Sequence, residues 1–147
     1  MKITDALRGE HAILYRLLDH IATQSASWTA AQAHDAGRLL AAALGSHAQL
    51  EDDLLFRALE PYIAAQQGPL AVMRMEHSAM EGAFERLPDT TEADDAQSLL
   101  LYLVDVAREH CAKEEQVLFR MAEQSLGDKR LRELGAAWAE RRAVAVA

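Results

Sequence analysis

Apolar residues recur with the spacing of an α-helix through most of this sequence, in five segments. Short breaks with proline, glycine or clustered polar residues separate the segments, as expected where helices end. The predicted helices span residues 4–23, 29–59, 69–87, 93–123 and 128–144. No stretch alternates between apolar and polar residues over the length of a strand, so the pattern predicts an all-α fold.

Four of these segments are long, and the links between them are short. Long helices joined by short links pack as antiparallel neighbours, so we expect residues 1–124 to form an up-down-up-down four-helix bundle. Residues 125–147 are predicted to add a short C-terminal helix. Its apolar residues Leu131, Leu134 and Trp138 suit packing on the bundle or on a partner chain, as in a homodimer.

Length, charge and cysteine content narrow the functional class. The 147 residues fit one domain, and the formal net charge of -8 argues against nucleic acid and anionic membrane surfaces as partners. No apolar run reaches the roughly 18 residues of a membrane-spanning helix. Charged Asp5, Arg8 and Glu10 interrupt the region where a secretory signal would be apolar. The single cysteine, Cys111, cannot form an intramolecular disulfide, so we expect a cytoplasmic protein.

An internal repeat relates the two halves of the predicted bundle. The segment that begins at His47 reads HAQLEDDLLFRALE, and the segment that begins at His110 reads HCAKEEQVLFRMAE. Upstream of these, the pair Glu10-His11 matches Glu76-His77. The bundle is therefore predicted to consist of two related helical hairpins, each with a Glu-His pair on its first helix and a His-x-x-x-Glu pair on its second.

Three of the six histidines are followed by a glutamate four residues later. This spacing leaves both side chains on one face of a helix, about one turn apart, so they can reach the same metal ion or adjacent ones. A fourth histidine lies on the apolar face of the first helix. The candidate metal ligands are His11, His47, Glu51, His77, Glu81, His110 and Glu114. Buried carboxylates need compensation, which a metal supplies, and mixed imidazole and carboxylate ligands suit iron, manganese or zinc.

These residues resemble those of the hemerythrin family, specifically the bacterial HHE cation-binding proteins, over about residues 11–123. The resemblance implies a non-haem centre of two iron ions bridged by carboxylates. It further implies that His11 and His47 hold one iron, that His77, Glu81 and His110 hold the other, and that Glu51 and Glu114 bridge them.

The sequence departs from the oxygen-carrying hemerythrins at two positions. Glu81 stands where those proteins have a second histidine, which makes the site richer in carboxylates and argues against simple reversible oxygen carriage. The fourth-helix acid of the carriers lies five residues after its histidine, which would select Glu115 here. The repeat instead aligns Glu51 with Glu114, so we favour Glu114 as the bridge and keep Glu115 as the alternative.

The repeat also predicts that the two irons are unequal. It aligns Glu81 with Tyr15, which lies four residues after His11. We expect the iron held by His11 and His47 to keep an open position for O₂, peroxide or a related small ligand. The phenol of Tyr15 would hydrogen-bond to that ligand or bind the metal.

The other two histidines, the cysteine and three further glutamates are not expected to bind metal. His20 and His34 are expected at the surface, and Cys111, rotated about 100° from His110, is expected to pack in the core. Glu10, Glu76 and Glu109 each precede a candidate ligand histidine. We interpret these three glutamates as solvated helix charges rather than partners of the histidines.

Two functions fit the predicted centre. The first is a protein that binds O₂ or a related small ligand, for sensing or scavenging O₂, nitric oxide or peroxide, or for handling iron itself. The alternative is a di-iron redox enzyme, such as one that consumes peroxide. A ferritin-like oxidase is disfavoured because no histidine has a glutamate three residues before it, and the His-Glu-x-x-His motif of zinc hydrolases is absent.

Overall fold

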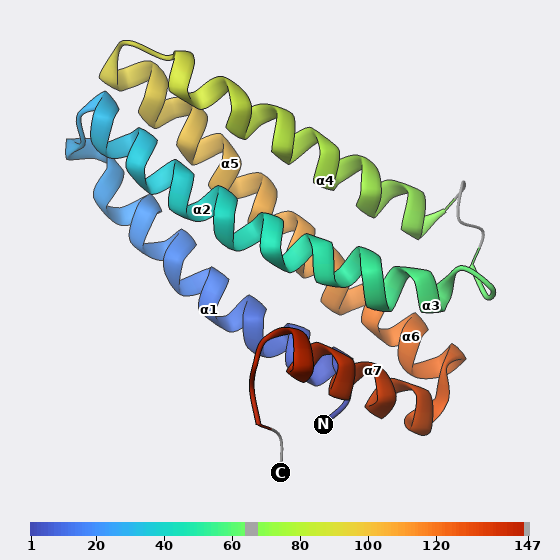
Figure 1. Cartoon of the computed structure of the whole chain (residues 1–147). Coiled ribbons are helices and arrows are strands. Elements are labelled where there is room, and N and C mark those ends of the chain that lie inside the picture. The colour runs from blue at the N-terminus through green and yellow to red at the C-terminus, as the bar shows by residue number, and fades with distance from the viewer. Residues whose placement is uncertain (64–67, 146–147) are drawn as a thin grey trace.

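The computed structural model describes residues 1–63 and 68–145, and these form a bundle of helices with no strand among them (Figure 1). The long helices are α1 (Ile3–Gln24), α2 (Ala30–Leu50), α4 (Pro69–Arg86) and α5 (Ala93–Lys113). The shorter helices are α3 (Arg57–Leu59), α6 (Phe119–Ser125) and α7 (Gly127–Arg141). Consecutive long helices run in opposite directions, so the predicted all-α, up-down-up-down bundle is confirmed.

Local sequence signals explain where the helices begin. Thr29 caps α2 through a reciprocal pair of hydrogen bonds, in which its hydroxyl accepts from the Gln32 backbone and Gln32 accepts from the Thr29 backbone. Gly68 precedes α4 with a φ of 84°, a left-handed conformation that favours glycine, and Pro69 occupies the first helical position. These ends lie within a few residues of the predicted ones.

Two π-helical segments were not predicted. One spans Glu51–Phe56 and joins α2 to α3, and the other spans Glu114–Leu118 and joins α5 to α6. They begin at equivalent positions of the internal repeat, each at a candidate ligand glutamate. A π-helical turn holds an extra residue, which changes the direction of the side chains that follow it.

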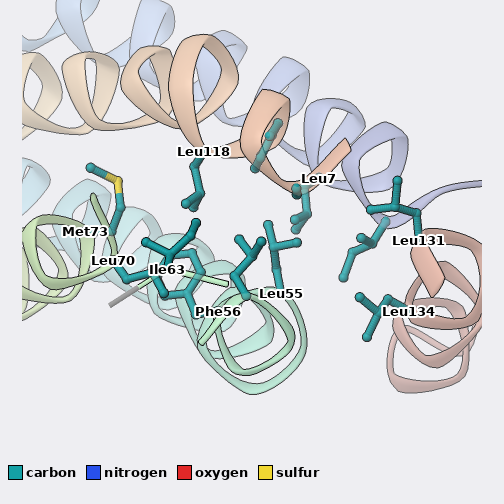
Figure 2. Packing of buried hydrophobic residues seen from close by; sticks show 13 residues of the cluster. Leu7, Leu55, Phe56, Ile63, Leu70, Met73, Leu118, Leu131 and Leu134 are labelled. Atoms are coloured by element: carbon teal, nitrogen blue, oxygen red, sulfur yellow. The ribbon is translucent and has the colours of Figure 1, made fainter. Parts of the chain in front are cut away.

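The core consists of two apolar clusters. The first lies near the chain termini and is drawn in Figure 2; it includes Leu7, Leu55, Phe56, Leu70, Met73, Leu118, Phe119, Leu131 and Leu134. The second lies toward the other end of the bundle and includes Leu14, Leu18, Leu40, Leu44, Met80, Leu100, Val104 and Ala107.

A polar layer lies between these clusters. Along α1, buried His11 separates Leu7 of the first cluster from Leu14 of the second. Along α4, His77 separates Met73 from Met80 in the same way. The apolar clusters therefore enclose the predicted ligands from both ends of the bundle.

Helix α7 packs beside the start of α1, close to the N-terminus (Figure 1). Its buried Leu131 and Leu134 join the first apolar cluster, so the helix lies on the bundle of its own chain. Gly135 permits this approach, because a Cβ there would collide with the carbonyl oxygen of Met1.

None of the helices in the described ranges is both long and apolar enough to cross a bilayer.

Candidate metal centre

Six of the seven predicted ligands meet in the polar layer. Their donor atoms form two groups that share both glutamates, and the atoms within each group lie within 4.8 Å of one another. The first group is His11, His47, Glu51 and Glu114; the second is His77, His110, Glu51 and Glu114. Each of the four long helices thus supplies one histidine, and each π-helical segment supplies one glutamate.

The histidines face each other in two pairs. The Nε2 atoms of His11 and His47 are 2.9 Å apart, and those of His77 and His110 are also 2.9 Å apart.

Each shared glutamate spans the two pairs. The two carboxylate oxygens of Glu51 lie 3.2 Å from Nε2 of His47 and 3.7 Å from Nε2 of His77. Those of Glu114 lie 3.3 Å from Nε2 of His11 and 3.4 Å from Nε2 of His110. Each carboxylate therefore lies within reach of both histidine pairs.

Each of the four histidines also lies close to a second carboxylate, at its other ring nitrogen, Nδ1. Nδ1 of His47 lies 2.7 Å from Glu10, and Nδ1 of His110 lies 2.8 Å from Glu76. The remaining pairs are His11 with Glu115 at 2.8 Å and His77 with Asp52 at 3.5 Å. Because an ionised carboxylate only accepts hydrogen bonds, each Nδ1–H donates outward, and the Nε2 lone pair of the neutral ring points into the site.

This arrangement fits a pair of metal ions. Glu51 and Glu114 are fully buried, and none of their four carboxylate oxygens makes a hydrogen bond within the described part of the chain. When the rings are neutral, two Nε2 lone pairs that face each other cannot hydrogen-bond to one another either. Cations between these atoms would bind the histidine nitrogens and the carboxylate oxygens together, and would so compensate for the burial of both. Apolar packing alone would not compensate for it.

The internal repeat extends into the surroundings of the ligands. The ring of Phe119 stacks on His11 at 5.5 Å between centroids, and that of Phe56 stacks on His77 at 5.7 Å. The interpretation of Glu10 and Glu76 as solvated charges was wrong, because each holds a histidine of the neighbouring helix. The repeat contained a signal for this role, since it aligns these two glutamates with each other.

Glu81 is the predicted ligand that the structure does not bring into either group. Its side chain is exposed and lines a pocket beside His77. The two groups consequently offer the same donors, and the inequality expected from Glu81 is not present among them. Of the two alternative bridges, Glu114 belongs to both groups, whereas Glu115 lies behind His11.

Tyr15 lies near the centre without belonging to either group. Its half-buried ring is 6.3 Å from that of His11, measured between centroids. Burial above all raises the pKa of Tyr15 to about 12, so the phenol is protonated at neutral pH. Cys111 is fully buried in the second apolar cluster, as expected for a packing residue.

Helix α7 reaches the centre through Glu10. The Glu10 carboxylate accepts hydrogen bonds from Nε1 of Trp138 at 2.7 Å and from Nε and Nη2 of Arg142 at 2.7 and 2.9 Å. Burial raises the pKa of Glu10, but its hydrogen bonds with His47 and Arg142 outweigh burial and bring the pKa down to about 2. Besides the bond from His110, the equivalent Glu76 accepts one bond in the described part of the chain, from Nζ of Lys113 at 2.6 Å.

We expect Arg142→Ala to weaken metal binding at the position held by His11 and His47. Loss of the Arg142 bonds frees Glu10, so Nδ1 of His47 loses a fixed acceptor. Removal of such outer partners lowers metal affinity about 10-fold or more. Competition with a chelator measures this loss for one of the two ions, and Arg142→Lys should restore part of it. Equal affinity of both ions in Arg142→Ala would contradict the role of α7.

Protonation of the histidines should make the metal-free protein less stable at high pH. Burial lowers the pKa of His47, but the charge of Glu51 and the bond to Glu10 outweigh it and raise the pKa to about 10. Burial also lowers the pKa of His110. The hydrogen bond and the charge of Glu114, together with the hydrogen bond to Glu76, outweigh burial and raise this pKa to about 9.

Because these folded-state values lie above the ordinary histidine value of about 6.5, the protonated rings stabilise the metal-free fold fully below pH about 6.5. This stabilisation is lost as the pH rises to about 9–10. Thermal melts of the metal-free chain between pH 6.5 and 10 should show a falling Tm, and the metal-loaded chain should not follow it. A flat profile for the metal-free chain would contradict the assignment.

Comparison with known families gives one match. The family model described as the hemerythrin HHE cation binding domain matches residues 2–139, nearly the whole chain and most of α7. No curated protein and no solved structure matches the sequence. The match covers all six residues of the two groups, and the fold is the helical bundle expected from the resemblance. This chain therefore belongs to the hemerythrin HHE cation-binding domain family.

Proposed function

We propose that the chain binds two iron ions and uses them to bind O₂, nitric oxide, peroxide or a related small ligand. His11 and His47 would hold one ion, His77 and His110 the other, and Glu51 and Glu114 would bridge the pair. The observation that supports this most directly is that the carboxylates of Glu51 and Glu114 are fully buried and have no hydrogen-bond partner among the described residues. When bound, the two irons would supply a redox-active centre for the ligand.

The donor set supports iron over softer metals. Each group offers two imidazole nitrogens and two carboxylate oxygens, and no thiolate takes part. Imidazole with carboxylate suits iron, manganese and zinc, so the latter two compete for the same residues. Our proposal of iron rests on the resemblance to the di-iron members of the family, and metal analysis of the protein purified from its native cell tests it.

The enclosure of the site supports a small ligand. Four protein donors leave further positions on each iron, as in other non-haem iron sites that keep positions open. Apolar clusters close the layer toward both ends of the bundle, so large substrates cannot approach along the bundle axis. The carboxylates that accept from Nδ1 of the histidines fix the ring orientations and keep Nε2 free for the metal.

Stopped-flow spectroscopy of the iron-loaded protein tests this function. We expect the ferrous protein to change its absorbance on mixing with O₂ or nitric oxide, and the metal-free protein to show no change. No spectral change with either ligand or with peroxide would contradict the proposal. Sustained consumption of added peroxide over many turnovers would instead favour the alternative, a peroxide-consuming redox enzyme that uses the same residues.

A further inference from the structure

The two sides of the candidate metal centre differ although their ligands repeat. Beside His47, a pocket of about 290 Å³ lies between α1 and α2. Arg142 reaches across this pocket from the end of α7, where it binds Glu10 and also donates a 2.5 Å hydrogen bond to the hydroxyl of Ser46. The position held by His11 and His47 is thus covered on this side by α7.

Beside His77, a larger pocket of about 650 Å³ lies between α2 and α4. Gly45, Ala48, Met80 and Phe84 contribute to its wall, and no residue of α7 is among those that line it. The side chain of His77 is 10% exposed, whereas those of the other three histidines are at most 3% exposed. The centre is therefore most accessible at His77.

The wall of the α2–α4 pocket is acidic. Asp52, Asp53, Glu81 and Glu85 line it, and among the described residues no lysine or arginine does. Asp53 is paired with Arg141, but no ion pair of Glu81 or Glu85 occurs in the described part of the chain. A negatively charged wall repels anions and leaves the approach of uncharged molecules unaffected.

An adjoining pocket shares Asp52, His77 and Glu81 with this one and adds two arginines. Arg57 lies 3.5 Å from Asp53, which also pairs with Arg141, and Arg74 lies 2.5 Å from Glu60 and 3.7 Å from Asp52. Five carboxylates therefore stand against three arginines around the two pockets: Asp52, Asp53, Glu60, Glu81 and Glu85 against Arg57, Arg74 and Arg141. The surroundings of the exposed edge of His77 are therefore net negative.

We propose that uncharged small ligands enter through the α2–α4 pocket and bind at the metal position held by His77 and His110. This inference rests on the proposed function and specifies the ligand class and the binding position. Since both groups offer the same donors, access decides which ion meets the ligand. The open position then lies on the side opposite to the one expected from Tyr15, and Glu81 forms part of the entrance wall instead of a ligand set.

Narrowing each pocket separately tests the route. A Cβ at Gly45 would meet no atom within 4 Å, so Gly45→Leu extends the wall of the α2–α4 pocket without a clash at its Cβ. Ile13 lines the opposite pocket and is 73% exposed, so Ile13→Trp is the matched control on that side. The probe is nitric oxide, mixed with the ferrous protein in a stopped-flow instrument after the metal content of each variant has been measured.

We expect Gly45→Leu to slow nitric oxide association about 5-fold or more, and Ile13→Trp to change it less than about 2-fold. Unchanged association in Gly45→Leu, or slowing in Ile13→Trp, would overturn the proposed route. A wild-type protein that holds no metal would instead contradict the proposed function itself, so the two failures are distinguishable.

The negative charge of the α2–α4 pocket wall allows a second test of the proposed route. Glu81→Gln combined with Glu85→Gln should speed azide association with the ferric protein several-fold at low ionic strength, because two negative charges leave the entrance. Nitric oxide association and metal content should stay unchanged. If the double variant loses metal, Glu81 acts as a ligand and its assignment to the wall is overturned; if azide association does not respond, the anion barrier is overturned.

Discussion

Replacing Glu51 by glutamine is expected to abolish the binding of both metal ions. One carboxylate oxygen of Glu51 faces His47 and the other faces His77, so a single side chain serves both groups. A neutral amide cannot bridge two cations as a carboxylate does. After iron reconstitution, metal analysis should find fewer than about 0.5 ions per chain in Glu51→Gln, because neither group keeps its shared anionic ligand.

Above about pH 10, where His47 has lost its proton, the same variant should leave the metal-free chain at least as stable as wild type. Burial, followed by the charge of Glu114, raises the pKa of Glu51, which means that its ionised form is disfavoured in the folded metal-free protein. Glutamine has nearly the same shape and removes that charge. A metal-free Tm well below wild type at that pH would show that Glu51 stabilises the fold in its own right, and would contradict its assignment as a ligand retained for the metal.

Glu114→Gln should behave like Glu51→Gln, and Glu115→Gln provides its matched control. Glu114 is shared by both groups, whereas Glu115 lies behind His11 only. We expect Glu115→Gln to keep both ions with reduced affinity for one of them. If instead Glu115→Gln loses both ions and Glu114→Gln keeps them, the bridge is Glu115, which would contradict the assignment of Glu114.

Metal loading should raise the Tm by about 10 °C. A ligand present at a thousand times its dissociation constant stabilises the folded state by about 4 kcal/mol, and each kcal/mol shifts the Tm by about 2–4 °C in a chain of this size. Calorimetric scans before and after addition of a chelator measure the difference. Glu51→Gln should show no shift, which separates specific binding from effects of the chelator on the fold. A wild-type shift below about 2 °C would indicate weak or absent binding.

The fold was predictable because its signals are local. Apolar residues at helical spacing located all four long helices and α7, and Gly68-Pro69 located the start of α4. The π-helical segments were not predictable in this way, since one extra residue in a turn leaves no mark in the spacing of apolar residues. They matter for the site, because each begins at a glutamate shared by both donor groups.

The site was predictable where the His-x-x-x-Glu spacing coincided with the internal repeat. His47 with Glu51 and His110 with Glu114 satisfy both conditions, and all four side chains are buried together. His77 with Glu81 has the same spacing, but the repeat gives Glu81 no acidic counterpart. Its side chain lies at the edge of the α2–α4 pocket instead. The spacing alone places two residues on one helix face and does not fix which of them reaches the interior.

The carboxylates that contact Nδ1 of the histidines were not predicted, for a related reason. Glu10 precedes His11, so it points about 100° away from the ligand face of its own helix, and it was assigned to solvent. In the structure it points toward α2, where it meets His47. Sequence spacing describes one helix at a time, whereas such contacts depend on how neighbouring helices are rotated against each other.

The number of metal ions per chain tests the central claim most directly. The two groups of histidines and shared glutamates predict about two tightly bound iron ions per chain after anaerobic reconstitution and removal of excess metal, measured by elemental analysis against protein concentration. Fewer than about one tightly bound ion per chain would contradict the account.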